Sequence, residues 1–308
     1  MPTPPLLLLA FNRPDRLARL LASLKCLSPQ VVRVSIDGPR NVQDLAGVQA
    51  CQRLASEVDW VPDYGVWTRD TNVGITRGIP LSVSRFLLDF SEVFVIEDDV
   101  TLGPDALHFV AQALDCWRNH PTIHTVSAYN MVPESEITMP SEPVRLSRVS
   151  SSYAWATWDH KWQHFDSEMT AFRRQSLRSQ KDLLGSYAAA VRWRQHVRYS
   201  RLGLVDCAAY KWNTSTWHYD GQSVVPNVNL VQYHGMQDGT HTRRKRRWKE
   251  LPVGPINLGT LEECALSDAV DARADRFFHA RVQRASWANI LLGPVEECAL
   301  RARRRGWI

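Results

Sequence analysis

Paired cysteines are absent from this sequence. The six cysteines are scattered along the chain and form no Cys-x-x-Cys pair. This spacing argues against a structural zinc site and against a disulfide framework, and it is typical of a protein in a reducing cytoplasm. We therefore expect a cytoplasmic location.

Long apolar runs are absent too. No stretch approaches the roughly 20 apolar residues that a transmembrane helix needs. The short apolar run at residues 6–11 has no basic segment before it and leads directly into Asn12, Arg13 and Pro14, so we do not interpret it as a targeting segment. These absences predict a soluble protein, or at most one at the surface of a membrane.

A large excess of one charge sign is also missing, because 37 Lys and Arg residues face 32 Asp and Glu residues and give a net charge of +5. This balance is unlike that of a dedicated nucleic-acid-binding protein, so we predict no nucleic-acid partner. The basic excess is local, at residues 243–249 and 301–305. Such runs are most often solvated faces, and near Trp they also suit peripheral contact with the anionic inner face of a membrane. The sequence does not indicate an oligomeric state.

What the sequence does contain is a regular alternation of strand-like and helix-like segments. With 44% hydrophobic residues, the chain can bury a large core. Strand-like segments lie at residues 6–11, 31–36, 65–69 and 93–96, and helical segments follow the first three at 14–27, 42–57 and 75–89. This order predicts an α/β fold with a mostly parallel sheet flanked by helices. Later in the chain we expect an irregular aromatic segment at 150–165, helical structure over 166–201 and a basic helical tail.

A run of carboxylates follows the fourth strand-like segment. Residues 93–96 suit a strand that is buried on both faces, and Glu97, Asp98 and Asp99 come directly after them. Adjacent carboxylates repel one another unless a cation lies among them. Because ligands of α/β proteins collect at the carboxyl ends of the strands, this run indicates a Mg²⁺ or Mn²⁺ ion that carries nucleotide phosphates. The alternative is a solvated strand end that happens to be acidic.

Polar residues also follow the first two strand-like segments. Phe11, Asn12 and Arg13 come after the first, and Arg13 is suited to charge-assisted hydrogen bonds with a diphosphate. Asp37 ends the second, where its carboxylate can accept from a nucleotide base or a ribose hydroxyl. Asn12 and Asp37 are equally suited to cap a helix or to form a turn, so neither alone indicates a ligand.

A turn-rich segment precedes the third helical segment. Asn72, Gly74 and Arg77 lie where that helix is predicted to begin, and the amino end of a helix favours phosphate. In the alternative interpretation, Gly74 meets a backbone requirement and Arg77 is a surface charge. Because the loops after parallel strands meet at one edge of a sheet, we expect these residues to form one ligand site with the acidic run.

Twelve tryptophans are many for a chain of this length, and three of them, Trp155, Trp158 and Trp162, lie close together. Sugar rings stack on aromatic faces because their C–H edges are apolar. We predict that Trp155 and Trp158 line a sugar pocket. The alternative is ordinary packing in the core, which we favour for Trp162.

Several of these motifs occur together in the order seen in GT-A glycosyltransferases. The sequence resembles the N-acetylglucosaminyltransferase I type of that group and its bacterial relatives, over about residues 6–242. The segments that carry the resemblance are residues 9–13, 35–38, 72–74, 95–100, 126–130, 155–158, 225–231 and 239–242.

The resemblance implies a GT-A (Rossmann-like) fold and a metal-dependent, inverting sugar transfer from a nucleotide-sugar donor, with UDP favoured, to a glycan, lipid-linked or protein acceptor. Asp99 would bind Mn²⁺ or Mg²⁺ directly, and Asp98 and Glu97 would support the metal and the donor sugar. Asp37 would face the base, and Arg13 would lie near the nucleotide. The implied division is a nucleotide-sugar-binding half at residues 1–130, an acceptor-binding half of the same domain at 131–250 and a basic helical C-terminal tail at 251–308.

The resemblance does not fix the catalytic base. Relatives often have a carboxylate where this sequence has Ala209, and Asp206 is the nearest substitute, with Asp220 and Asp238 in reserve. The alternative for Asp206 is a helix cap. His241 would be a second metal ligand or a diphosphate contact, or else a loop residue that forms ordinary hydrogen bonds.

Two other functions stay open on the sequence alone. A sugar-nucleotidyltransferase would use a related sheet, but that class usually has a Gly-rich loop after the first strand, where this chain has Asn12, Arg13 and Pro14. A non-catalytic scaffold that binds a membrane or a partner would have a degenerate site. Ala209 favours that alternative, whereas the intact acidic run opposes it.

Overall fold

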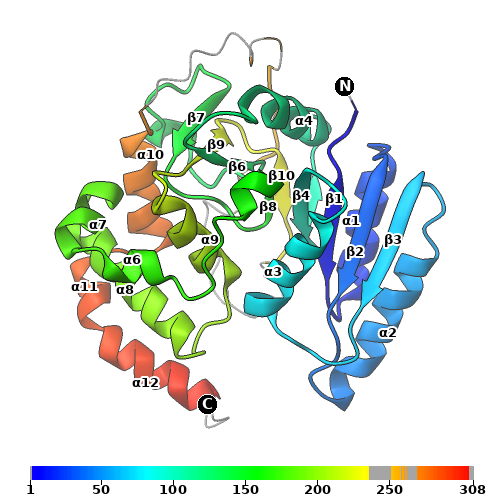
Figure 1. Cartoon of the computed structure of the whole chain (residues 1–308), viewed down its shortest axis with the longest axis horizontal. Helices are drawn as coiled ribbons and strands as arrows, with labels where there is room; N and C mark the ends of the chain where they lie inside the picture. Colours follow the sequence, from blue (N-terminus) through cyan, green and yellow to red (C-terminus); the bar gives the residue numbers. More distant parts are fainter. Residues whose placement is uncertain (1, 236–250, 258, 260, 262–268, 305–308) are drawn as a thin grey trace.

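One mixed sheet forms the centre of the protein (Figure 1). The computed structural model describes residues 2–235, 251–257, 259, 261 and 269–304. The sheet has the strand order β3-β2-β1-β4-β8-β6-β9-β7. The strands are β1 (Leu6–Ala10), β2 (Val31–Ile36), β3 (Asp63–Thr68), β4 (Glu92–Glu97), β6 (Ile123–Ser127), β7 (Val144–Ser147), β8 (Ala154–Trp158) and β9 (Gln222–Pro226). Strands β1 to β4 are parallel, and β8 runs antiparallel between β4 and β6.

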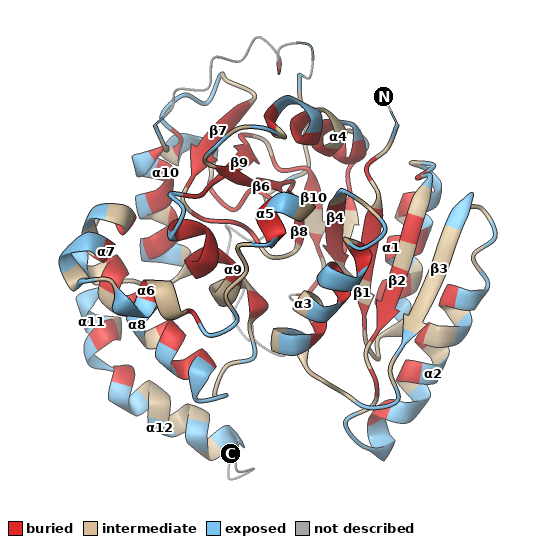
Figure 2. Ribbon diagram, viewed as in Figure 1, coloured by how far each residue is buried: buried red, intermediate tan, exposed pale blue. Residues whose placement is uncertain are grey.

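The central strands are apolar on both sides because helices cover both faces of the sheet (Figure 2). The covering helices are α1 (Pro14–Lys25), α2 (Val42–Ser56), α3 (Ile75–Phe86), α4 (Ala106–Trp117) and α9 (Ala208–Trp217). Leu6, Leu8 and Phe94 pack with α1, α2 and α4. Leu7 and Val95 alternate with them and pack with α3 and α9 on the other face. The predicted α/β fold, with its mostly parallel sheet flanked by helices, is confirmed.

Helix α1 shows how the local sequence sets this packing. It begins at Pro14, whose fixed φ suits the first turn of a helix and whose missing N–H is not needed there. Leu17, Leu20, Leu21 and Leu24 then recur at helical spacing, and all four are buried against the sheet. The helical segment predicted at residues 14–27 is confirmed, and its apolar face packs on the sheet.

The helical stretch predicted over residues 166–201 is divided into three helices. They are α6 (Thr170–Arg174), α7 (Leu177–Leu184) and α8 (Tyr187–Arg201). Ser176 and Ser186 interrupt the stretch because each side chain accepts a hydrogen bond from a backbone N–H of the helix that follows. Gly185 ends α7 in the left-handed conformation, at φ 77°.

The C-terminal segment is helical, as predicted, and it packs onto α8. Its helices are α10 (Ala272–Phe277), α11 (Trp287–Leu291) and α12 (Gly293–Arg304), with a π-helical turn, η3 (Phe278–Val282), between the first two. Arg192 Nη1 of α8 lies 2.5 Å from Glu296 Oε2 of α12. The Tyr199 hydroxyl donates to the carbonyl of Gly293 at 2.9 Å. Part of the tail is therefore fixed to the domain rather than extended from it.

Short elements complete the described part of the chain. Strand β5 (Val100–Leu102) pairs antiparallel with β10 (Val231–Tyr233) in a separate small sheet. Helix α5 (Asp159–Trp162) follows β8, and a 3-10 helix, η1 (Glu134–Glu136), lies in the loop after β6. Among the described residues, no helix has both the length and the apolar content that crossing a membrane requires.

Candidate active site

The acidic run lies at the carboxyl end of β4, as the sequence predicts. Glu97 is the last residue of that strand, and Asp98 and Asp99 form the turn into β5. We call these three residues the acidic rim. Burial, followed by repulsion from Asp99 and Asp98, raises the pKa of Glu97 well above its usual range. Burial and the charge of Asp99 raise the pKa of Asp98 to about 7. The rim is therefore a place where additional positive charge would be stabilising.

Arginines next to the rim supply part of that positive charge. Arg13 follows β1, the parallel neighbour of β4, and Arg16 lies in the first turn of α1. Both charges act to lower the pKa of Asp98. Arg16 Nη1 lies 3.6 Å from Asp99 Oδ2, and the Arg16 side chain is only 5% exposed. Arg16 was not among the site residues predicted from the sequence, although its place one turn after Arg13 was the available signal.

The donor set of the rim consists of carboxylate oxygens, which suit Mg²⁺ or Mn²⁺. Within the described ranges, no three His, Cys, Asp or Glu side chains are arranged to hold a metal ion. Mg²⁺ is commonly held by one or two carboxylates, with water and substrate phosphates completing its ligands. The rim fits an ion of that kind better than a closed site made of protein ligands. His241, the second predicted ligand, lies outside the described residues.

Asp37 and Asn72 join two loops at the same edge of the sheet. One oxygen of the Asp37 carboxylate accepts from the backbone N–H of Val73 and the other from that of Gly74, both at 3.1 Å. The Asn72 Nδ2 group donates to the carbonyl of Gly38 at 2.9 Å. These contacts correspond to the turn-forming alternative, and a nucleotide base would have to share an oxygen of Asp37 with them.

The segment after β1 is held by α2. Asn12 Nδ2 donates to Asp44 Oδ1 at 2.6 Å, and Arg40 forms an ion pair with the same carboxylate, with 2.7 Å between Nε and Oδ2. The Arg40 guanidinium also lies over the ring of Phe11, 5.0 Å from its centroid. Asn12 and Phe11 therefore fix the position of Arg13 beside the rim.

Asp206 caps the helix that was predicted to bind phosphate. Its carboxylate accepts from the backbone N–H groups of Ile75 at 2.9 Å and Thr76 at 2.6 Å, and it also accepts from the Thr76 hydroxyl. Gly74 has φ +75°, and a Cβ added there would lie 2.8 Å from Asp206 Oδ2. The position thus requires glycine for two reasons. Arg77 is exposed in the first turn of the same helix.

This contact also brings the start of α9 to the edge of the sheet that carries the acidic rim. Gly74, next to Ile75, donates to Asp37 at the carboxyl end of β2, and β2, β1 and β4 are parallel neighbours. Asp206, the amino end of α3 and the rim therefore lie at one edge of the sheet. The reserve acid Asp220 instead pairs with Arg148 at 2.7 Å, and Asp238 lies outside the described residues.

The two tryptophans predicted to line a sugar pocket lie in the core. Trp155 is 5% exposed and packs between Trp162 and Trp212, with 6.0 Å between its ring centroid and each of theirs. Trp158 has no exposed surface and donates its Nε1–H to the carbonyl of Leu114 at 3.1 Å. The core alternative describes both residues, because neither ring presents a face on which a sugar could stack.

A group of tyrosines next to the rim was not found from the sequence. The rings of Tyr129 and Tyr153 lie 5.4 Å apart, and those of Tyr153 and Tyr233 lie 4.8 Å apart. Burial, then the neighbouring Tyr233 and the charges of Glu97 and Asp99, raise the pKa of Tyr153 well above its usual range. Gly235 lies close to the same group, since a Cβ added there would lie 2.7 Å from Asp99 Oδ2. The three tyrosines come from separate segments of the chain, so no local pattern in the sequence joins them.

Comparison with known proteins adds little to this description. No family model matches the chain, and no curated protein matches it. Among solved structures, it is similar to mouse xyloside xylosyltransferase 1, with a TM-score of 0.34 and 14% identity over 52% of this chain and 68% of that one. It is also similar to HddC from Yersinia pseudotuberculosis, with a TM-score of 0.33 and 11% identity over 50% of this chain and 76% of that one. Mannose-1-phosphate geranyltransferase from Thermus thermophilus has a TM-score of 0.32 and 12% identity over 72% of this chain and 73% of that one. Similarities this weak do not establish an activity, which has to be argued from the site.

Proposed function

We propose that this protein is a glycosyltransferase that moves a sugar from a nucleotide-diphosphate donor, with UDP favoured, to a glycan, lipid-linked or protein acceptor. The observation that carries the proposal is the acidic rim at the carboxyl end of a buried parallel strand. Burial, together with repulsion among its three carboxylates, raises the pKa of Glu97 and Asp98. Arg13 and Arg16 beside them supply positive charge, which suits a diphosphate next to a metal ion.

In the proposed mechanism, Asp99 would hold a Mn²⁺ or Mg²⁺ ion with support from Asp98 and Glu97. Such an ion would supply Lewis-acid chemistry by neutralising the charge that develops on the leaving diphosphate. Arg13 contacts the diphosphate, while Asp37 keeps the neighbouring loop in place through its backbone contacts. The acceptor hydroxyl then attacks the anomeric carbon from the face opposite the leaving group, which inverts its configuration.

Asp206 is the proposed general base that takes the proton of the acceptor hydroxyl. Its carboxylate is exposed and lies at the same edge of the sheet as the rim. The bonds to Ile75 and Thr76 hold the carboxylate in a fixed direction. The cap alone also explains those bonds, so the two roles of Asp206 require an experiment that separates them.

The proposal is tested first by thermal unfolding with UDP and Mn²⁺. We expect UDP with Mn²⁺ to raise Tm by about 3–6 °C at a hundredfold excess over Kd, because a ligand that binds only the folded state stabilises it. Mn²⁺ alone should have little effect. A screen of UDP-, GDP- and TDP-sugars for metal-dependent hydrolysis then identifies the donor.

Two results would contradict the proposal. Formation of a nucleotide-sugar from a nucleoside triphosphate and a sugar phosphate would assign the protein to the sugar-nucleotidyltransferases instead. No stabilisation by any nucleotide, together with no hydrolysis of any donor, would favour the non-catalytic scaffold.

An exposed apolar surface on α11 and α12 supports peripheral contact with the inner face of an anionic membrane. We call Trp287, Leu291, Leu292 and Val295 the apolar ridge; they are 57%, 77%, 57% and 65% exposed. Basic residues lie in the last turn of α12. An apolar ridge next to arginines suits a lipid surface with anionic headgroups, since the arginines attract the headgroups while the ridge enters the interface.

Replacement of both Leu291 and Val295 by serine should weaken sedimentation with vesicles of phosphatidylglycerol and phosphatidylcholine by about tenfold or more, because burying each side chain contributes roughly 1.5–3 kcal/mol. The matched control is Leu88→Ser, at a site 84% exposed and outside the ridge. Equal sedimentation of the wild-type protein and the double variant would show that the ridge does not enter the membrane.

A further inference from the structure

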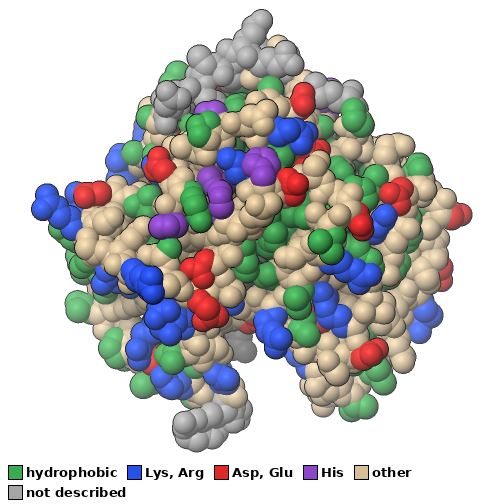
Figure 3. All heavy atoms as spheres, in the orientation of Figure 1, with side chains coloured by type: hydrophobic (Ala, Val, Ile, Leu, Met, Phe, Trp, Pro, Cys, Tyr) green, Lys and Arg blue, Asp and Glu red, His purple; other side chains and the backbone are tan. Residues whose placement is uncertain are grey.

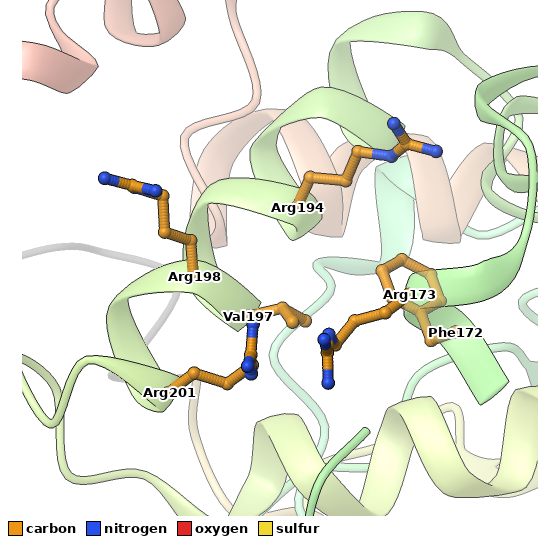
Figure 4. Close-up of a pocket in the computed structure, with 6 residues that line it drawn as sticks. All are labelled: Phe172, Arg173, Arg194, Val197, Arg198 and Arg201. Atoms are coloured by element: carbon orange, nitrogen blue, oxygen red, sulfur yellow. The ribbon is translucent and has the colours of Figure 1, made fainter. Parts of the chain in front are cut away.

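Four arginines line an open pocket between α6 and α8, and Figure 4 shows them around it. The pocket has a volume of about 250 Å³. Its lining residues are Phe172, Arg173, Arg194, Val197, Arg198 and Arg201. We call it the arginine pocket. The helices that form the arginine pocket, α6 and α8, are separate from the strand β4, which carries the acidic rim at its end.

The charge of the arginine pocket has one sign. None of its lining residues is acidic, and Figure 3 shows Lys and Arg side chains gathered on the face over α6 to α8. Arg198 is the lining arginine that has a carboxylate partner, because Glu297 of α12 binds its guanidinium through two hydrogen bonds of 3.0 and 3.1 Å. Like charges gathered at one opening repel one another, so an anion bound there would be stabilising.

The floor and one wall of the pocket are ordered by buried contacts. Phe172 and Val197 are 1% and 4% exposed and form an apolar floor. Gln180, which is completely buried, accepts from Arg194 Nε at 2.5 Å and donates to the carbonyl of Phe172 at 2.7 Å. The orientation of Arg194 is therefore fixed by its hydrogen bond to the completely buried Gln180 side chain.

Arg173 and Arg201 complete the pocket from opposite sides. In Figure 4 their guanidinium groups point toward one another just below Val197 in the view, whereas Arg198 points away from them. Within the described residues, neither Arg173 nor Arg201 has an ion pair or a side-chain hydrogen bond. A planar guanidinium donates two parallel hydrogen bonds to a phosphate, so two of them facing one space suit a phosphate group placed between them.

We propose that the arginine pocket binds a phosphate-bearing group between Arg173 and Arg201, with Arg194 as a third donor. The ligand chemistry is a phosphomonoester or a diphosphate, carried either by a free small molecule or by a lipid headgroup. This site is separate from the proposed donor site and uses none of its residues, so the failure of one proposal does not decide the other.

The test is calorimetric titration with inorganic pyrophosphate at low ionic strength, with EDTA present so that no divalent ion retains the probe at the acidic rim. The double variant Arg173→Gln with Arg201→Gln should bind at least about tenfold more weakly than the wild-type protein, since hydrogen bonds to charged groups are being removed. Arg178→Gln is the matched control, because Arg178 is exposed on α7 and does not line the pocket. Added salt should weaken the wild-type interaction.

A second arm measures sedimentation of the same three proteins with vesicles of phosphatidic acid and phosphatidylcholine, because phosphatidic acid carries a phosphomonoester headgroup. Loss of pyrophosphate binding in the double variant supports the proposal and assigns the pocket to a free phosphorylated molecule. Loss of vesicle binding alone supports it and assigns the pocket to a lipid headgroup. Equal binding by all three proteins, or no binding in either arm, would overturn the proposal.

Discussion

The variant Asp99→Asn should lose metal-dependent turnover of the nucleotide-sugar by at least about a hundredfold, because it removes the charge that is proposed to hold the ion at the leaving diphosphate. The change in stability should be small by comparison. The lost attraction to Arg16, 3.6 Å away, is offset by relief of repulsion with Glu97 and Asp98. Initial rates and thermal unfolding of the same preparation measure the two effects.

The control for this variant is Asp89→Asn, which makes the same chemical change at an exposed residue near the amino end of β4. It should leave turnover unchanged. If Asp99→Asn keeps wild-type turnover at every Mn²⁺ concentration tested, the metal role of the acidic rim is wrong.

Asp206→Asn should lower kcat by about 10²- to 10⁴-fold if Asp206 is the general base, since that is the usual contribution of proton transfer. Asparagine has one acceptor oxygen where aspartate has two, so this variant removes the charge but still accepts from one of the N–H groups of Ile75 and Thr76. Tm should therefore fall less than in a variant that removes both acceptors.

The companion variant Asp206→Ala separates the two roles. It removes the cap as well, which costs about 0.5–2 kcal/mol of stability. Asp220→Asn serves as a control, because Asp220 is 64% exposed and already paired with Arg148. Wild-type turnover in Asp206→Asn, together with a larger fall in Tm in Asp206→Ala, would leave Asp206 as a cap and place the base elsewhere.

Local patterns in the sequence predicted the part of the fold where neighbours along the chain are also neighbours in space. The strands of the first third and the apolar stripe of α1 follow from period and composition, and they were found. The break at Gly185 was missed although its signal, a glycine between two serine caps, is local. Strand β8 was also missed, since its five residues are too few to show a clear period, and its pairing with β4 and β6 defines it as a strand.

The sequence predicted which edge of the sheet carries the site residues, but it did not predict the contacts that these residues form. The sequence placed the acids and the loops of Asp37 and Asn72 at one edge of the sheet, and the structure brings them there. It could not show that Asp206 would reach α3 from 130 residues away, or that Trp158 would be needed inside the core. Both depend on how the two halves of the sheet pack, and pattern within one segment carries no information about that.

The pairing of β5 with β10 has a consequence for how the rim is made. The backbone of Asp99 also accepts a hydrogen bond from His234, at 2.8 Å. Strand β10 lies more than a hundred residues after the acidic rim in the sequence. The ribosome therefore adds all of these residues before β5 has a strand to pair with. Until β10 has been synthesised, the three mutually repelling carboxylates of the acidic rim lack these contacts. The acidic rim is therefore among the last parts of the protein to acquire its final geometry.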